Sequence, residues 1–164
     1  MRTISADATN GKAFEQQGSP IEAHLGFWLR FVSNHVSARF QKLLEAEGVS
    51  LTEWVALRTL LGQEGVSHTQ LIEALGMTKG ATSKVVTRLQ EKGLAERWLA
   101  DGRSREQVLV LTPAGQMLVP RLAALADAND QHFFGHLPGE ERKGLLALMQ
   151  GLVQHHQMRE LPTH

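Results

Sequence analysis

The sequence predicts a mainly helical fold with one small β-hairpin, in which a winged helix-turn-helix stands between long helices at the two chain ends. Apolar residues recur at three- and four-residue spacing over most of the chain, which is typical of amphipathic helices. Residues 67–93 hold two such segments separated by Gly76, which is the pattern of a helix-turn-helix. Residues 94–100 instead alternate, and a polar turn cluster at 100–106 separates them from a short β-rich run at 107–111, as in a hairpin.

The composition is that of a soluble globular chain. Of its 164 residues, 42% are apolar, 21% are charged and 5% are aromatic. Cysteine is absent, which excludes disulfides, thiolate metal ligands and a cysteine nucleophile. The sequence shows neither a signal-peptide pattern nor an apolar run of about 20 residues that could span a membrane. These features predict a cytoplasmic protein.

The first long helix is expected at residues 21–47, after a mobile polar tail at residues 1–20. Gly48 is expected to end it. Its apolar stripe is wider and longer than a small monomeric domain needs. The stripe comprises Ile21, Leu25, Trp28, Phe31, Val32, His35, Val36, Phe40, Leu43 and Leu44.

Three short helices are expected next, each with a polar cap at its start and a glycine at its end. In a helix-turn-helix the later helix of the pair is the one that contacts nucleic acid, and here that is the helix after Thr78. Ala81, Val85 and Leu89 would form its core stripe. The cap and stop residues are Ser50 or Thr52 with Gly62, Ser67 with Gly76, and Thr78 with Gly93.

The predicted hairpin pairs residues 94–100 with the β-rich run 107–111. Thr112 and Pro113 then begin a helix that is expected to reach about Gly135, with a bend or local break at Pro120. Its inward face is predicted to hold Met117, Leu118, Leu122, Leu125 and Ala126. A last helix after Pro138 is predicted to turn Leu145, Leu148, Met149, Leu152 and Val153 inward.

A local excess of positive charge lies within a chain whose net charge is zero. Between Thr78 and Arg105 there are seven positive and three negative side chains, a net charge of +4, so the remainder carries −4. Such a segment is typical of a face that meets phosphate, although each cation taken alone is more often an ordinary solvated charge. The cations are Lys79, Lys84, Arg88, Lys92, Arg97, Arg103 and Arg105.

Three stretches together resemble the multiple-antibiotic-resistance regulator (MarR) family: LTEWVALRTL, SHTQLIEALGMTKGATSKVVTRLQEKGLAER and VLVLTPAG. The most specific part is RLQEKGLAER, a charged hairpin tip and LTPAG at this spacing. The resemblance, which extends from about residue 21 onward, implies a sequence-specific DNA-binding regulator. It would act as a repressor and as a homodimer on a pseudo-palindromic duplex operator. Residues 21–47 and 113–160 would then form the dimerisation region, and residues 48–112 the winged helix-turn-helix domain.

The wing departs from the Asp-x-Arg pattern of the family, and two registers stay open. Counting back from Thr112 places Arg103 where the aspartate belongs and Arg105 at the wing arginine. Counting by motif gives Asp101-Gly102-Arg103, with two extra residues before the strand. Either register predicts a wing that presents both arginines, which suit a narrow minor groove.

The predicted DNA contacts combine hydroxyls, cations and backbone N–H groups. Ser83 and Thr87 suit base edges or phosphate, and the lysines and arginines suit the backbone or a guanine edge. Residues 67–70, at a helix start, can donate backbone N–H groups to a phosphate. The full predicted set is Ser67, His68, Thr69, Gln70, Thr78, Lys79, Thr82, Ser83, Lys84, Thr87, Arg88, Arg103, Ser104 and Arg105.

The resemblance also implies a cleft for a small aromatic or phenolic effector that releases DNA. Aromatic walls and an arginine suit an aromatic carboxylate. The alternative stays open at equal weight, in which the aromatic residues are core and the arginines are surface or paired. The predicted effector residues are Phe27, Arg30, Phe31, His35, Trp54 and Arg58.

Three rival functions are weighed from the residues. His132 and His136, spaced i, i+4, raise the alternative of a metal-responsive regulator, but surface histidines are the favoured interpretation and no metal or other cofactor is predicted. No phosphate-binding glycine loop, GxSxG or HExxH is present, so no enzyme is predicted. The last alternative is an interaction adaptor that keeps the winged fold without DNA binding.

Overall fold

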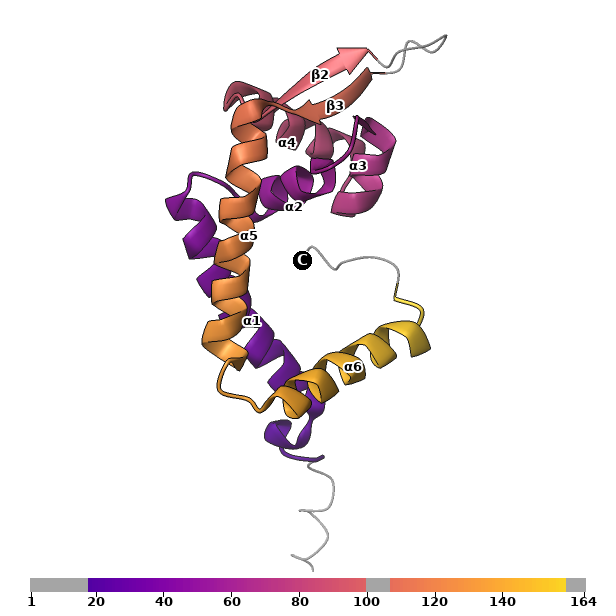
Figure 1. The fold of residues 1–164 in the computed structure, drawn as a ribbon. Coiled ribbons are helices and arrows are strands. Elements are labelled where there is room, and N and C mark those ends of the chain that lie inside the picture. The colour runs from indigo at the N-terminus through magenta and orange to yellow at the C-terminus, as the bar shows by residue number, and fades with distance from the viewer. Residues whose placement is uncertain (1–17, 100–106, 159–164) are drawn as a thin grey trace, which may run out of the picture. The chain divides into compact units, whose positions relative to one another are not determined.

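The computed structural model describes residues 18–99 and 107–158, so the predicted tail is described only from residue 18. No helix of the described residues is long and apolar enough to cross a membrane. The described residues form six α-helices, one short 3-10 helix and three strands (Figure 1). In chain order these are η1 (Ile21–Ala23), α1 (Leu25–Ala46), α2 (Leu51–Leu60), β1 (Val66–Ser67), α3 (His68–Leu75), α4 (Lys79–Glu91), β2 (Ala95–Leu99), β3 (Gln107–Leu111), α5 (Pro113–Phe134) and α6 (Gly139–His155).

The chain divides into two compact units, residues 1–35 and residues 36–164. In the first unit the long helix begins at Leu25 and not at Ile21. His24 has an extended backbone, with φ −95° and ψ 125°, and its N–H donates to the Ile21 carbonyl at 3.1 Å. That conformation separates a single 3-10 turn from the helix, a break that apolar spacing alone does not reveal.

Side-chain caps fix where the short helices of the second unit begin. Ser50 Oγ accepts from the Glu53 N–H at 3.2 Å, and Glu53 Oε2 accepts from the Ser50 N–H at 2.8 Å. This reciprocal pair is a capping box, and it identifies Ser50, not Thr52, as the cap of α2. Gly76 ends α3 with φ +59°, the left-handed conformation that the turn into α4 requires.

The sheet contains the predicted hairpin and one strand that the sequence did not predict. β2 and β3 pair antiparallel, with Ala95 opposite Leu111 and Leu99 opposite Gln107. β1, only two residues long, pairs with the other edge of β3, so the strand order is β1-β3-β2. A two-residue strand is too short to show alternation, which is why it escapes a pattern search.

The core of the second unit gathers apolar side chains from α2, α3, α4, the sheet and α5 around the end of α1. It therefore joins the helix-turn-helix to the wing strands and to α5. Its fully or nearly fully buried members are Leu44, Val49, Ala56, Leu57, Leu60, Val66, Leu71, Leu75, Val85, Val86, Leu89, Ala95, Leu109, Leu111, Val119 and Leu122.

The start of α5 is attached directly to the chain that enters the wing. Thr112 Oγ1 accepts from the Gly115 N–H at 3.1 Å and donates to the Gly93 carbonyl at 2.6 Å. The Thr112 N–H donates to the Leu94 carbonyl at 3.1 Å. Gly115 lies so close that a Cβ there would overlap the Leu94 carbonyl oxygen. Backbone packing therefore requires the glycine of LTPAG. Thr112 caps α5, as predicted.

The inward face of α5 agrees with the prediction at Leu122, which is buried, and at Leu118 and Leu125, which pack against the core, but not at Met117. Gly115, Val119, Leu122 and Asn129 are buried, whereas Met117, placed inward from its spacing, is 76% exposed. α5 also runs unbroken across Pro120, so no local break occurs there. The missing N–H of a proline removes one helical hydrogen bond, and the rest of this 22-residue helix tolerates the loss.

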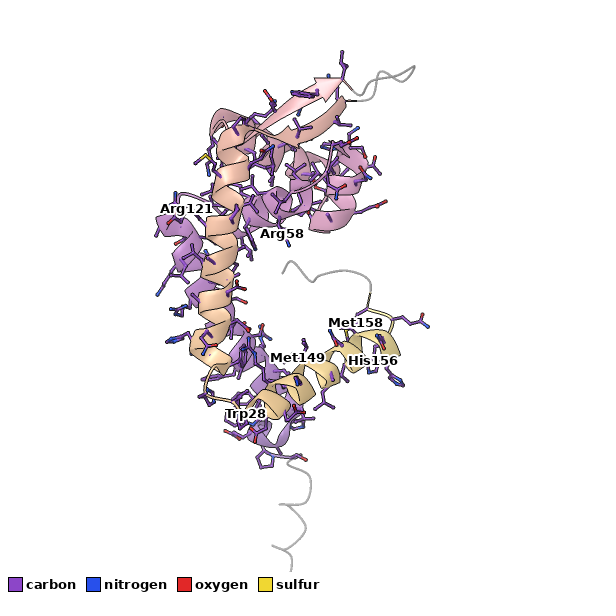
Figure 2. The ribbon with its side chains drawn as sticks, in the orientation of Figure 1. Trp28, Arg58, Arg121, Met149, His156 and Met158 are labelled. Carbon is purple, nitrogen blue, oxygen red and sulfur yellow. The ribbon has the colours of Figure 1, made fainter. Side chains whose placement is uncertain are left out.

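The last helix leaves its apolar side chains uncovered within the single chain. No residue of α6 is buried, and Leu148 is 71% exposed. The prediction that Leu145, Leu148, Met149, Leu152 and Val153 point inward is therefore wrong for one chain. Figure 2 shows Met149 on α6.

A partly buried ion pair connects the residue after α4 to the start of α2. Glu53 is 1% exposed, and both of its carboxylate oxygens accept from Lys92 Nζ, at 2.8 and 2.7 Å. Lys92 Nζ also donates to the Gly48 carbonyl at 2.8 Å. Burial by itself raises the pKa of Glu53, but the hydrogen bonds from Lys92 and Ser50 outweigh it and hold that pKa below its usual value.

Glu53→Gln should weaken the fold and remove part of its acid sensitivity. A carboxyl whose pKa is lowered on folding contributes stability above its unfolded-state pKa of about 4.3, and that stability is lost as the pH falls through the folded-state value. We expect the substitution to cost about 1–3 kcal/mol at neutral pH. Urea unfolding across a pH series measures it. Glu73→Gln, at an exposed carboxyl on α3, is the control, and identical acid dependence in Glu53→Gln and wild type would contradict the assignment.

Candidate nucleic-acid interface

One face of α4 is polar, positively charged and exposed. The helix begins at Thr78, whose Oγ1 accepts from the Ala81 N–H at 3.3 Å. The opposite face is buried through Val85, Val86 and Leu89. Helical spacing then directs the exposed side chains outward together, so α4 offers cations and hydroxyls on a surface wide enough for a duplex groove. They are Lys79, Lys84, Thr87 and Arg88.

Thr82 corrects the predicted contact set. Its side chain is 0% exposed, on the face of α4 that packs into the core, so it cannot reach a nucleic acid. Its Oγ1 has no hydrogen-bond partner among the described residues. A polar residue type suggested a surface position, but Thr82 stands three residues before Val85 and seven before Leu89, and this helical spacing places it on their buried side.

Ser83 is held in place by contacts within the helix-turn-helix. Its Oγ donates to the Lys79 carbonyl at 2.9 Å and lies 3.1 Å from His68 Nε2 on α3. Thr87 Oγ1 donates to the Ser83 carbonyl at 3.0 Å. Because both hydroxyl protons are engaged by the helix, these side chains present their lone pairs outward as acceptors.

The start of α3 offers fewer free N–H groups than predicted. Ser67 Oγ accepts from the Gln70 N–H at 3.3 Å, and Gln70 Oε1 accepts from the Ser67 N–H at 2.8 Å. This second capping box engages two of the four predicted donors. Only His68 and Thr69 can present backbone N–H groups to a phosphate at this helix start.

A front cleft with a cavity volume of about 390 Å³ lies beside α4, between the two helices and the sheet. Its cationic lining includes Lys79 and Arg97, and His68 and Ser83 border it as well. Arg97 was counted in the basic segment but was not among the predicted contacts. The alternation of β2 could have indicated this position of Arg97, because it turns the Arg97 side chain to the same side of the sheet as α4.

Not every cation of the basic segment is available to a ligand. The charge of Lys92 is neutralised by Glu53, so it supports the domain and does not serve the surface. The wing strands place Leu99 opposite Gln107 next to the tip. The tip residues Arg103, Ser104 and Arg105, and with them the two wing registers, lie outside the described residues and stay predictions.

The residues predicted to line an effector cleft fall into two groups. In the first unit, the ring centroid of Phe31 lies 6.1 Å from that of Phe27 and 4.5 Å from that of His35. All three residues lie on α1, as does Arg30. In the second unit, Trp54 packs edge to face on Phe40 at 6.2 Å. Arg58, on the same helix as Trp54, is exposed (Figure 2). A cleft that joins the two groups stays a prediction.

The two histidines considered as metal ligands do not share a helix. His132 lies in α5, whereas α5 ends at Phe134 and His136 follows in the turn. The i, i+4 argument for a common helix face therefore fails. In the described part of the chain no three or more His, Asp or Glu side chains gather in a way that could hold a metal ion.

Comparison with known proteins finds similarity to one family. The sequence profile of the MarR family matches residues 47–106. The transcriptional regulator HosA of Escherichia coli O111:H- is 23% identical over 146 residues, which cover 89% of this chain and 98% of HosA. The HTH-type transcriptional repressor Rv2887 of Mycobacterium tuberculosis is 25% identical over 131 residues, 80% of this chain and 94% of the repressor.

Solved structures share the winged fold. Rv2887 in complex with p-aminosalicylic acid superposes with a TM-score of 0.63 at 26% identity, over 79% of this chain and 98% of that one. The Staphylococcus aureus MepR–DNA complex superposes with a TM-score of 0.69 at 21% identity, over 82% of this chain and 98% of MepR. The similarity therefore extends well beyond the helix-turn-helix.

Proposed function

We propose that the chain, whose residues 47–106 match the MarR family profile and whose relatives include transcriptional regulators, represses transcription as a homodimer bound to duplex DNA. The observation that carries this proposal is the exposed face of α4, with Lys84, Thr87 and Arg88 on one side of the helix. In a helix-turn-helix this helix enters the major groove, where cations reach phosphates or guanine edges and hydroxyls accept from base amino groups.

The neighbouring elements would hold the duplex from both sides of α4. The start of α3 presents His68 and Thr69 towards one phosphate strand. Across the front cleft, Arg97 extends the positive surface towards the wing. MepR, which has the same fold, has been solved in complex with DNA.

The wing arginines should contribute to affinity from the minor groove. We expect Arg103→Ala and Arg105→Ala each to weaken binding to a selected duplex by about 1–3 kcal/mol, because guanidinium groups favour narrow A·T tracts. Fluorescence anisotropy measures the change. The control is Arg121→Ala. Arg121 lies on α5, not on α4, and forms an exposed ion pair with Glu47. Wild-type affinity in both wing variants would exclude the wing from the interface.

Two uncovered apolar surfaces support the homodimer. Leu25 at the start of α1 is 81% exposed, and in the other unit Leu148, Leu152 and Val153 of α6 are exposed as well. Apolar patches of this kind mark association surfaces. A two-fold dimer would present two copies of α4 about one DNA turn apart, so the operator should be a pseudo-palindrome.

Sedimentation equilibrium tests the dimer. We expect wild type at twice the chain mass and Leu148→Glu/Leu152→Glu shifted towards monomer, because each carboxylate would be buried without a partner. Gln150→Glu adds a charge at an exposed polar position of α6 and serves as control. A monomeric wild type, or a double variant that stays dimeric, would remove the proposed surface.

A small aromatic carboxylate is proposed as the effector that releases DNA. Rv2887, a relative that is a repressor, was solved with p-aminosalicylic acid, which belongs to this class. Arg58 is the exposed cation beside Trp54 on α2 and would pair with the carboxylate. Titration of p-aminosalicylic acid into the protein–duplex complex should restore free duplex, and Arg58→Gln should require a higher concentration.

A further inference from the structure

A second groove, with a cavity volume of about 490 Å³, lies at the base of the wing, and it differs in chemistry from the front cleft. This rear groove is bordered by the end of α2, by β2 and β3, and by the first turn of α5. Its volume is within the range of small-molecule sites. The lining residues that carry the argument are Leu61, Gln63, Glu64, Trp98, Val110 and Gln116.

Trp98 gives this groove an aromatic wall. Successive residues of a strand point to opposite faces, so Arg97 borders the front cleft while Trp98 borders the rear groove. The Trp98 side chain is 57% exposed, far more than a tryptophan that serves only to fill a core. Its indole ring is therefore available to a ligand.

The charge around the rear groove is negative. Glu64 lines it, and no lysine, arginine or histidine does so among the described residues. Glu96, two residues before Trp98 on β2, pairs with Val110 and lies on the same face of the strand as Trp98. The front cleft, with Lys79 and Arg97, has the opposite sign.

Helix ends add to this negative potential. α2 ends at Leu60, and its carbonyl end, which carries partial negative charge, borders the groove through Leu60 and Leu61. The positive N-terminal end of α5 is less exposed there, because the Gly115 N–H is already donated to Thr112 Oγ1. The carboxylates of Glu64 and Glu96, together with the carbonyl end of α2, thus favour a cation.

We propose that the rear groove binds a small organic cation that carries an aromatic or alkyl body, with the charge between the Trp98 ring and the Glu64 carboxylate. A cation over an indole face is attracted by the ring quadrupole, and a carboxylate beside it supplies the counter-charge. Gln63 and Gln116 can donate to or accept from polar groups of the ligand. This site is separate from α4 and from the residues predicted for an aromatic carboxylate.

Calorimetric titration of the full chain with benzyltrimethylammonium, in the absence of DNA, tests the proposal. Benzoate, which has the same ring with the opposite charge, is the matched ligand. We expect benzyltrimethylammonium to bind and to shift the NMR signal of the Trp98 indole N–H, and benzoate to leave that signal unchanged. Because no DNA is present, a negative result leaves the DNA-binding proposal unaffected.

Two substitutions locate the binding. Trp98→Leu removes the ring but keeps an apolar side chain, and Glu64→Gln removes only the charge; each should weaken benzyltrimethylammonium about threefold to tenfold. Both positions are exposed, so both variants should fold, and Glu73→Gln on α3 should bind as wild type does. No heat above dilution, wild-type affinity in both variants, or equal binding of benzoate at Trp98 would overturn the proposal.

Discussion

Lys84→Glu/Arg88→Glu is expected to abolish specific duplex binding while the protein stays folded. Both side chains lie on the exposed face of α4, and neither forms an ion pair within the described residues. Each removed contact to a phosphate or guanine edge costs about 1–3 kcal/mol, and each introduced carboxylate repels the phosphates. In a dimer the substitutions occur twice. We expect affinity to fall about a hundredfold or more in fluorescence anisotropy.

A matched charge change elsewhere separates this effect from net charge. Lys42→Glu/Arg121→Glu makes the protein equally more negative, but its sites are exposed positions on α1 and α5. Only the exposed pair between Arg121 and Glu47 is lost, and such pairs contribute about 0–1 kcal/mol. The control should lose far less affinity than the α4 variant. Equal losses would mean that overall charge, not the α4 face, governs binding.

Gly115→Ala is expected to destabilise the fold strongly, although it adds only one methyl group. The added Cβ would overlap the Leu94 carbonyl oxygen and lie 3.1 Å from Leu111 Cδ2. A backbone carbonyl cannot rotate away as a side chain can, so α5 must move away from the wing or the domain must open. We expect a loss of about 3 kcal/mol or more, a large part of the stability of a domain of this size.

Gly80→Ala provides the comparison, since nothing lies within 4 Å of a Cβ built at Gly80. Alanine is the better helix former, so this variant should gain up to about 1 kcal/mol. Urea unfolding at one fixed protein concentration gives both values, because the stability of a dimer depends on concentration. If Gly115→Ala unfolds at the wild-type midpoint, the close contact with Leu94 does not hold in solution.

Local signals predicted most of the fold. A helix cap or stop lies within one or two turns of the helix end that it fixes, so a short sequence pattern reveals it. This holds for the caps Ser67, Thr78 and Thr112 and for the stop Gly76. β1 escaped because its pairing with β3 joins residues about forty positions apart and leaves no periodicity. The ion pair between Glu53 and Lys92 is equally non-local.

The candidate site was predicted at the level of its helix but not of every side chain. Lys84, Thr87 and Arg88 are exposed as the helical wheel indicates, whereas Thr82, also polar, is buried. Residue type alone could not separate these cases; the position of Thr82 relative to Val85 and Leu89 could. Arg97 and Trp98 show the same point on a strand, where one step along the chain changes both the surface and its chemistry.

The salt dependence of duplex binding tests the central claim most directly. A labelled duplex is first selected from random sequences by the protein, and its affinity is then followed by anisotropy as the salt concentration rises. If the α4 face binds phosphate, the logarithm of affinity should fall linearly with the logarithm of salt, by about 0.9 per phosphate contact, and Lys84→Gln/Arg88→Gln should flatten the slope. Failure to select any duplex, or an affinity that salt does not change, would contradict the account.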